Sequence, residues 1–268
     1  MKASYNHLQD ADLLYHKLLD ISENYFEDDE IGEMDSFMKE ADFLLNGVKG
    51  TDAVIGIFNH RTFSPVLEVG GKEFWGNLPE VPKDERMVQI MSLLDKNYAS
   101  FFADSINWFQ ETLNAIPFKH RVNITIIHGG IRYWRLDNSP ICLFSKGLPI
   151  HYDAKRNFSF TFNYVQNIHH LLKKDFPHYW IRIACGANKE FVHTLHSADK
   201  KSSHKDLLSG REKEILQLIG EDLDTKEIAE KLFISTTTVG HHRSNMIERL
   251  GARDTTALVQ VAKMAEMI

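Results

Sequence analysis

Cysteine is scarce in this sequence, and long apolar runs and targeting segments are missing from it. Among the 268 residues only Cys142 and Cys185 are cysteines, and they form no CxxC pair, so neither a disulfide framework nor a redox motif is expected. We expect both to be buried thiols. No apolar run approaches the roughly 18 residues of a membrane span, and the first residues, MKASYNHLQDADLLYH, lack the apolar stretch of a signal peptide. These absences predict a cytoplasmic protein with no membrane partner.

Motifs of nucleotide binding, metal binding and catalysis are missing as well. The chain has neither a GxGxxG nor a GxxxxGK[ST] pattern. It has 14 histidines, but none lies in HExxH or at a Cys/His ligand spacing, and the adjacent His169 and His170 point in different directions on a helix. Neither a nucleophile–base pair nor paired carboxylates can be recognised. The sequence therefore predicts no catalytic residue, no metal site, no cofactor and no enzyme activity.

The excess of basic residues that is typical of DNA-binding proteins is also missing. The formal net charge is −6, and even residues 206–268 carry eight Lys or Arg against eleven Asp or Glu. The charge is unevenly placed, however, because residues 225–253 carry five basic residues against three acidic ones. We expect weak and short-ranged electrostatic steering toward DNA.

The end of the chain nevertheless has the pattern of a helix-turn-helix. Asp224 and Glu227 form a capping box that begins a short helix, and Ser235 can cap a second helix. Gly251 ends that second helix. Its apolar residues recur at helical spacing: Val239, Met246 and Leu250. Two short helices joined by such a turn are the unit that places its second helix in the DNA major groove.

Two further helices flank this unit. Ser209 and Glu212 form another capping box, which begins a helix with Ile215 and Leu218 on its inner side. Asp254 can cap a last helix. The resulting bundle of about 60 residues has a small but plausible core.

With these elements, residues 207–268 resemble the C-terminal DNA-binding domain of the LuxR family, also called FixJ/NarL. The resemblance rests on matches in register: Leu208-Ser209, Arg211-Glu212, Glu214-Ile215-Leu216, Lys226-Glu227-Ile228-Ala229, Leu232, Ile234-Ser235, Thr238-Val239, His242, Asn245 and Arg249-Leu250. It implies an all-α, four-helix DNA-binding domain. At position 222 the family usually has Gly and this chain has Asp, a residue that also tolerates a left-handed turn. Gly240 replaces a usual Lys, which removes a phosphate contact and costs about 1 kcal/mol relative to Ala.

One side of the second helix is expected to face DNA, because Val239 and Met246 occupy the other side. Asn side chains bind adenine bidentately, Ser and Thr can bond any base, and Arg or Lys meets phosphates. The alternative for Arg243 is a salt bridge to a carboxylate of the first helix. The residues expected to contact DNA are Lys226, Ser235, Thr236, Thr237, Thr238, Gly240, His241, His242, Arg243, Ser244, Asn245 and Arg249.

The last helix carries a stripe of small apolar residues: Ala257, Leu258, Val261, Ala262 and Ala265. In the resembling family this helix pairs two DNA-binding domains. The resemblance therefore implies a homodimer that binds two half-sites through this stripe. The alternative is that the stripe packs on the other helices of its own domain.

Residues 1–196 have the element order of an α+β domain. Helices are expected over 7–20 and 35–46, and a helical stretch over 84–115. Strands are expected over 53–58, 62–67, 122–126, 131–136, 141–144, 158–164 and 179–184, with one more helix over 167–174. The order predicts an antiparallel sheet with helices to one side. It resembles the PAS sensor fold, with a GAF-like sheet as the competing fold. The acidic stretch at 27–30 follows a helix rather than a strand, which argues against a phosphoreceiver domain.

Aromatic residues are numerous enough in this domain to line a ligand pocket. We select four as candidate ligand-binding residues: Trp75, Trp134, Phe160 and Phe162. The alternative is that aromatic residues on the faces of a sheet simply form the core.

The polar segment at 197–206, SADKKSSHKD, is expected to be a linker between the two domains. The sequence thus predicts a PAS-like sensor domain at 1–196 and a LuxR-type helix-turn-helix domain at 207–268. We expect a transcription regulator that binds double-stranded operator DNA and whose N-terminal domain senses a small molecule or a partner. The alternative is an interaction protein whose acidic C-terminal unit binds a protein.

Overall fold

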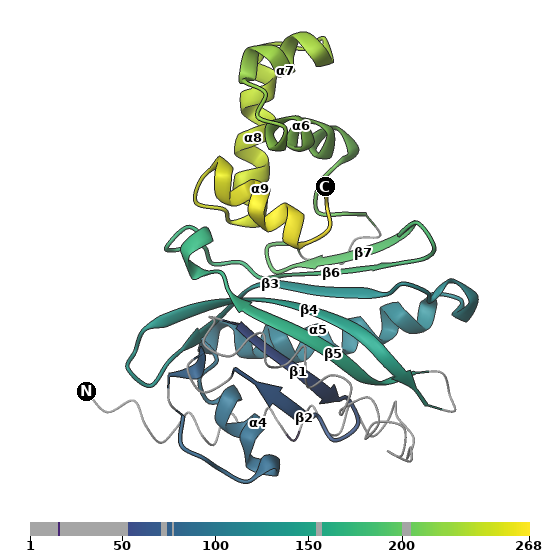
Figure 1. Ribbon diagram of the computed structural model, residues 1–268, viewed down its shortest axis with the longest axis vertical. Coiled ribbons are helices and arrows are strands. Elements are labelled where there is room, and N and C mark those ends of the chain that lie inside the picture. The colour runs from purple at the N-terminus through teal and green to yellow at the C-terminus, as the bar shows by residue number, and fades with distance from the viewer. Residues whose placement is uncertain (1–15, 17–52, 71–73, 77, 154–156, 200–204) are drawn as a thin grey trace.

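A computed structural model of the chain describes residues 16, 53–70, 74–76, 78–153, 157–199 and 205–268. Apart from His16, the helices expected over 7–20 and 35–46 and the acidic stretch at 27–30 lie outside these residues. The described residues form an antiparallel sheet with helices α4 and α5 against one face and a helical domain packed on the other, toward the β6–β7 end (Figure 1). The predicted α+β class is confirmed.

The sheet runs in the order β2-β1-β5-β4-β3-β6-β7, and each strand is antiparallel to its neighbours. The strands are β1 Ala53–Asn59, β2 Ser64–Val69, β3 Thr125–Trp134, β4 Pro140–Tyr152, β5 Phe158–Asn167, β6 Trp180–Cys185 and β7 Phe191–His196. The strands are rich in β-branched and aromatic residues, which pack well on the pleated surface of a sheet. The strands expected over 53–58, 62–67, 158–164 and 179–184 are confirmed with small shifts at their ends.

Strand β3 differs from the sequence expectation, which divided it between 122–126 and 131–136. A β-bulge between Gly129 and Ile131 lets one continuous strand pass through the two segments. Gly130 has a φ of +84° in this bulge, a conformation that glycine adopts without strain. Strand β7 was not expected and pairs with β6 at the edge of the sheet.

The helix expected over 167–174 is reduced to the 3-10 turn η3, His169–Leu171. The next residues bond to the helical domain instead of continuing a helix. Leu172 forms an isolated β-bridge with Ala252, and the Lys173 N–H donates to the Gly251 carbonyl at 2.8 Å.

Helices α4, Lys83–Met91, and α5, Lys96–Ala115, replace the single helical stretch expected over 84–115. The chain breaks between them because Leu94 bridges to Tyr133 and the Asp95 N–H donates to the Arg132 carbonyl at 3.0 Å. A short 3-10 turn, η2 Phe118–His120, then leads into the sheet. Among the described residues, no helix has both the length and the apolar character that crossing a bilayer requires.

The C-terminal domain contains α6 Gly210–Gly220, α7 Thr225–Leu232, α8 Thr236–Leu250 and α9 Thr255–Met264. The expected caps are confirmed by hydrogen bonds. Capping boxes begin α6 at Ser209 and α7 at Asp224, Ser235 caps α8, and Asp254 caps α9. Gly251 ends α8 in the left-handed conformation.

The sheet and the helical domain share one buried apolar cluster. Ile127, Phe144 and Trp180 of the sheet belong to the same cluster as Ile215 and Leu258 of the helical domain. The Phe176 ring packs so closely on Gly251 that a Cβ there would collide with it. The two domains are therefore packed together rather than joined only by the segment at 197–206.

A substitution at Gly129 tests the packing at the centre of the sheet. The Trp180 indole occupies the position of a Cβ at residue 129, so Gly129→Ala is expected to lower the free energy of unfolding by about 1–3 kcal/mol. Gly240→Ala is the matched control, because nothing lies within 4 Å of a Cβ there, and it is expected to raise stability by up to about 1 kcal/mol. Urea unfolding followed by tryptophan fluorescence measures both. Equal midpoints for wild type and Gly129→Ala contradict this packing.

Candidate DNA-binding interface and ligand cavity

Hydrogen bonds fix the turn between α7 and α8. Asp224 accepts the Glu227 N–H at 2.9 Å, and the Glu227 carboxylate accepts the Asp224 N–H at 2.7 Å. Phe233 has a left-handed φ of 54°, and the Ser235 hydroxyl accepts the Thr238 N–H at 3.0 Å. These bonds set the direction in which α8 leaves the turn, so the helix-turn-helix expected from the sequence is present.

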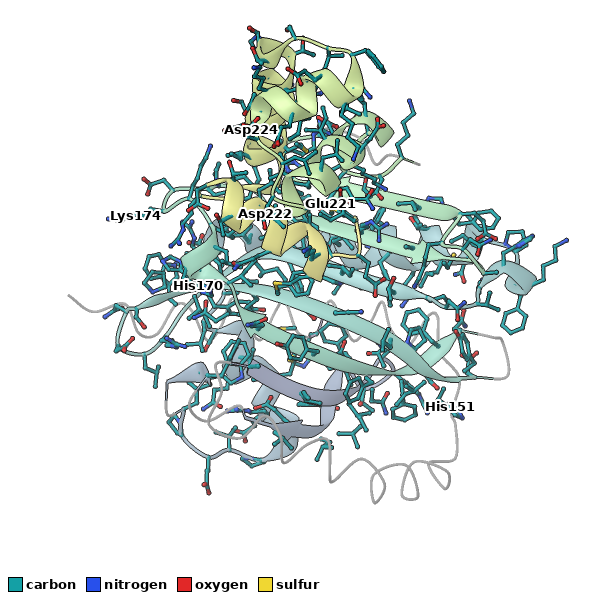
Figure 2. The ribbon with its side chains drawn as sticks, turned by 45° about the horizontal axis from the view of Figure 1, so that its top comes forward. His151, His170, Lys174, Glu221, Asp222 and Asp224 are labelled. Carbon is teal, nitrogen blue, oxygen red and sulfur yellow. The ribbon has the colours of Figure 1, made fainter. Side chains whose placement is uncertain are left out.

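The loop between α6 and α7 is rich in acidic residues. Glu221, Asp222 and Asp224 lie together in it (Figure 2). Asp222 has a φ of 64°, which confirms the left-handed turn expected where Asp replaces Gly. Three of the eleven acidic residues of 206–268 therefore lie in the loop that precedes α7.

Helix α8 presents a polar face to solvent. Val239, Met246 and Leu250 are completely buried on its inner side, as expected. The exposed side chains on the outer side are Thr237, His241, Ser244, Asn245 and Glu248. An amide, two hydroxyls and an imidazole on one open face can bond to the edges of bases.

The other expected DNA contacts surround this face. Lys226, Ser235, Thr236 and Arg249 are exposed. Thr238, Gly240 and His242 are half-buried. Because nothing lies within 4 Å of a Cβ at Gly240, the backbone of α8 is open to close approach at that point.

Arg243 serves an internal role in this structure. It is half-buried, and its Nη2 donates to the Thr225 hydroxyl at 2.9 Å, while its buried Nε has no acceptor among the described residues. The considered alternative was a carboxylate partner in the first helix, and the observed partner is a hydroxyl at the start of α7. Arg243 therefore ties α8 to α7, and its loss affects the geometry of the turn.

Two ion pairs modify the charge near α8. Lys226 is 79% exposed and lies 3.9 Å from Glu230, a geometry that leaves its ammonium accessible. Glu248, on the exposed face of α8, pairs with Lys173 of the N-terminal domain at 2.8 Å. The hydrogen bond and the charge of Lys173 hold the pKa of Glu248 below its usual value. This cation offsets the repulsion that Glu248 would exert on phosphates.

The structure corrects the placement of the expected dimer stripe. Its five residues on α9 are 0–1% exposed and belong to the same buried cluster as the inner residues of α6, α7 and α8: Ala257, Leu258, Val261, Ala262 and Ala265. The stripe is the core face of α9, which is the alternative that the sequence left open. Its small side chains let α9 pack closely against neighbouring elements.

A buried ion pair joins the helical domain to the sheet. Arg182 of β6 donates from Nε and Nη2 to the two carboxylate oxygens of Asp206, both at 2.9 Å, and Lys213 of α6 donates to the same carboxylate at 2.6 Å. Arg182 and Asp206 are 3% and 8% exposed. Burial favours a higher pKa for Asp206, but Arg182 and Lys213 hold the pKa below its usual value. The carboxylate stays ionised between the two domains.

A second polar contact lies at the other end of the interface. The Glu266 carboxylate pairs with Lys146 of β4 and lies 3.7 Å from Lys189, and it accepts the Thr125 hydroxyl at 3.2 Å. His196 Nε2 bonds to the backbone carbonyl of Arg249 in the last turn of α8 at 3.0 Å. The helical domain is thus held along both α8 and α9.

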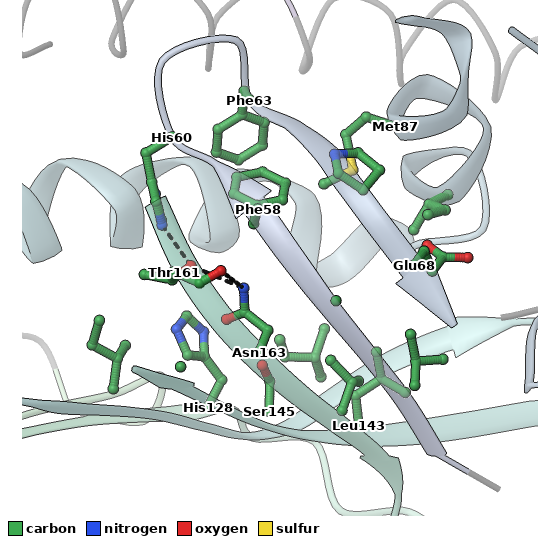
Figure 3. Close-up of a pocket in the computed structure, with 18 of the residues that line it drawn as sticks. Phe58, His60, Phe63, Glu68, Met87, His128, Leu143, Ser145, Thr161 and Asn163 are labelled. Carbon is green, nitrogen blue, oxygen red and sulfur yellow. Dashed lines mark hydrogen bonds between the residues drawn. The ribbon is translucent and has the colours of Figure 1, made fainter. Parts of the chain in front are cut away.

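The N-terminal domain contains a partly open, apolar cavity of about 250 Å³ between the sheet and helices α4 and α5 (Figure 3). Strands β1, β3, β4 and β5 form one wall, and Phe102, Ile106 and Phe109 of α5 lie on the opposite side. Most of the lining is aliphatic or aromatic, as is usual for sites that bind small molecules.

A small polar network lies in the sheet wall of the cavity. His60 Nε2 and Asn163 Nδ2 each bond to the Thr161 hydroxyl at 2.9 Å (Figure 3). His128 Nδ1 bonds to the Tyr179 hydroxyl at 2.6 Å. Burial lowers the pKa of His60 to about 3, with a smaller contribution from His128, and lowers the pKa of His128 to about 4. Both imidazoles are therefore neutral at neutral pH.

Of the four candidate ligand residues, only Trp75 lines this cavity. Phe160 and Phe162 point to the opposite face of β5, where Phe160 packs with Ile57. Trp134 is 41% exposed at the end of β3, and its indole N–H donates to Asp95. These three residues therefore lie outside this cavity.

The cavity uses residues that the sequence analysis did not select. Thr161 and Asn163 alternate with Phe160 and Phe162 along β5. Helix α5 faces the side on which Thr161 and Asn163 lie, so their polar side chains line the cavity. The usable signal in the sequence was the two histidines that follow apolar segments, His60 just after β1 and His128 after Ile126 and Ile127 of β3. Among the described residues, no group of three His, Cys, Asp or Glu side chains is arranged to hold a metal ion.

Comparisons with known proteins concern mainly the C-terminal domain. Residues 206–262 match the model of the family described as "Bacterial regulatory proteins, luxR family". The spore germination protein GerE of Bacillus subtilis is 41% identical over 70 residues, which are 26% of this chain and 95% of GerE. The Fimbriae Z protein of Escherichia coli K12 is 42% identical over 67 residues, but this chain spans only 32% of its length.

Similarity to solved structures extends over most of the chain but is weaker than the sequence similarity of the C-terminal domain to its relatives. The phage VqmA–DPO complex is 15% identical and aligns with 88% of this chain and 91% of its own, with a TM-score of 0.29. A TM-score this low supports no inference about the N-terminal fold.

Asp206→Asn is expected to weaken the joint between the domains. The substitution leaves Arg182 buried without its counter-ion, so we expect a loss of about 3–5 kcal/mol in the free energy of unfolding. Glu214→Gln is the matched control. Glu214 pairs with Arg211 at the solvent-exposed surface of α6, and such a pair contributes about 0–1 kcal/mol to the free energy of unfolding. Chemical denaturation of both variants gives the comparison. Equal losses would show that burial does not strengthen the pair.

The cavity histidines predict a loss of stability in mild acid. The unfolded chain binds their protons near pH 6.5, whereas the folded chain resists protonation down to about pH 4 at His128 and 3 at His60. Stability is therefore complete above about pH 6.5 and falls as the pH drops toward 4, by at most about 1.4 kcal/mol per pH unit for each histidine.

His128→Gln removes one of these two groups and is expected to flatten that pH dependence. Urea unfolding at pH 7, 6 and 5 measures the slope, and His170→Gln, at an exposed position, controls for the change of residue type. A slope in His128→Gln as steep as that of the wild type contradicts the assignment.

Proposed function

Because the chain belongs, through its C-terminal domain, to the luxR family of bacterial regulatory proteins, we propose that it is a sequence-specific, DNA-binding transcription regulator controlled by its N-terminal domain. One observation carries the proposal: α8 presents its polar face freely to solvent at the end of a fully capped helix-turn-helix. The family is one of regulatory proteins rather than of enzymes.

The exposed face of α8 would lie in the major groove, with Asn245, Ser244 and His241 toward the bases. Lys226 and Arg249 would meet phosphates on either side, and the backbone at Gly240 would allow close approach. Binding as a homodimer to two half-sites remains part of the proposal, since one module of this size gives little specificity. The buried stripe of α9 implies that copies meet through other residues.

The N-terminal domain is proposed to be a PAS-like sensor of a small molecule. The succession β1, β2, α4, α5, β3, β4, β5 supports this fold over other α+β arrangements, while a GAF-like sheet is the competing assignment. The cavity supports a ligand-binding role. Strands β6 and β7 extend the sheet on the side where the helical domain packs.

Two strands provide the proposed route from the cavity to the DNA-binding domain. On β3, Ile126 and His128 line the cavity while Ile127 between them belongs to the interdomain cluster. On β4, Leu143 and Ser145 line the cavity and Phe144 belongs to that cluster. Because adjacent residues point to opposite faces of a strand, a ligand that displaces β3 or β4 also displaces the surface on which the helical domain rests.

A protein-binding role for the C-terminal unit is the second candidate. It is favoured by Phe233, which is 95% exposed in the α7–α8 turn, and by the net acidic charge of residues 206–268. Salt distinguishes the two functions, because DNA binding falls steeply with salt concentration and an apolar protein contact does not.

Selection of bound sequences from a random DNA library tests the proposed function with the full chain. We expect an inverted repeat whose recovery weakens as salt is raised. Asn245→Ala is expected to relax the sequence preference at one position of each half-site, at a cost of about 1–3 kcal/mol. Lys226→Ala is expected to weaken binding to all sequences alike and to reduce the salt dependence.

Lys263→Ala is the matched control for charge, because Lys263 is exposed on α9, away from the exposed face of α8. These variants avoid Arg243, whose bond to Thr225 makes its removal a structural change. If the full chain enriches no sequence at low or moderate salt, in the presence or absence of cell extract as a source of ligand, the proposal fails and the protein-binding role is preferred.

A further inference from the structure

The lining of the cavity carries almost no charge. Among the described lining residues there is no lysine or arginine, and the carboxylate of Glu68 is paired with Arg86 at 2.7 Å. His60 and His128 are neutral, because burial lowers their pKa to about 3 and about 4. A charged ligand would lose its hydration without gaining a counter-ion, so the cavity favours an uncharged one.

One side of the cavity carries two side chains that can donate a hydrogen bond to a ligand, Trp75 and Tyr133. Trp75 is 5% exposed, and its buried indole Nε1 has no acceptor among the described residues. Its ring packs edge-on against Tyr133, with 5.4 Å between the ring centroids. Burial raises the pKa of Tyr133, so its hydroxyl keeps its proton and can donate to an acceptor in the cavity.

The polar groups of the sheet wall differ from this pair. Thr161 already bonds to His60 and Asn163, so that network is occupied within the protein. Buried donors are rarely left without an acceptor, and such a donor in the wall of a cavity indicates where a ligand acceptor belongs. The polar part of a ligand is therefore expected at Trp75 and Tyr133, with its apolar part among the side chains of α5 and β1.

We propose that the cavity binds a small, uncharged and largely apolar molecule through a carbonyl or similar acceptor, which receives the Trp75 indole N–H, with the Tyr133 hydroxyl as a second donor. The inference rests on the proposed sensor function for its biological role. Its chemistry rests only on the cavity, so it can be tested without DNA.

Four probes of similar size separate the parts of this proposal: acetophenone, ethylbenzene, benzoate and benzylamine. Titration calorimetry with the full chain at pH 7.5 measures their affinities. We expect acetophenone to bind about five- to tenfold more tightly than ethylbenzene, which has no acceptor. Benzoate and the benzylammonium ion are expected to bind at least about tenfold more weakly than acetophenone.

Trp75→Phe keeps an aromatic ring and removes the N–H. It is expected to reduce the affinity for acetophenone to that for ethylbenzene, and to leave ethylbenzene binding unchanged within about twofold. Tyr133→Phe is expected to reduce the preference for acetophenone in the same direction and serves if Trp75→Phe does not fold. Trp134→Phe is the matched control, since Trp134 lies outside the cavity and its loss leaves all four affinities unchanged.

The proposal is overturned if either ion binds more tightly than acetophenone, if none of the four probes binds, or if the preference for acetophenone over ethylbenzene survives in both Trp75→Phe and Tyr133→Phe. Failure of the proposed function gives a different result. In that case the chain still binds acetophenone through Trp75 but selects no DNA sequence. If the chain selects DNA but shows no preference for acetophenone, the proposed regulator function stands and the proposed ligand chemistry is wrong.

Discussion

The contact between Asp206 and Arg182 determines how the DNA-binding helices are held. The carboxylate lies just before α6, where it is shared between Arg182 of β6 and Lys213 of α6 itself. Since Asp206 and Arg182 are both buried, removal of either partner would leave the other charge desolvated and unpaired. The orientation of α8 is therefore set by the sheet rather than by a free linker, although the polar composition of 197–206 suggested the latter.

The same arrangement leaves the exposed face of α8 accessible while the domains are packed together. Lys173 comes from the N-terminal domain and pairs with Glu248 on α8, so part of the charge at the DNA-binding face depends on this packing. Behind it, β3 and β4 have the cavity on one face and the interdomain cluster on the other. A ligand in the cavity is thus separated from the helical domain by a single layer of strands.

The sequence predicts best those features that local chemistry determines. The caps at Ser209, Asp224, Ser235 and Asp254 need only neighbouring residues, and all are observed. Features that depend on distant partners were missed. The segment after Asn167 pairs with Ala252 instead of forming a helix, and the enclosed face of β5 is decided by α5. The stripe on α9 is equally apolar whether it packs on its own domain or on a second copy, so sequence alone could not distinguish the two.

Affinity for DNA in the isolated domain 207–268 and in the full chain tests the central claim most directly. Residues of 207–268 supply most of the buried cluster that they share with the sheet, and GerE is similar to this unit over 95% of its own length. On a single half-site the account predicts equal affinities, because the exposed face of α8 is open in both. On the inverted repeat it predicts at least about a tenfold difference, since the sheet fixes how two copies of α8 are presented, and couplings of this kind typically span about 5–150-fold. Equal affinities on the repeat at every salt concentration would contradict control by the N-terminal domain.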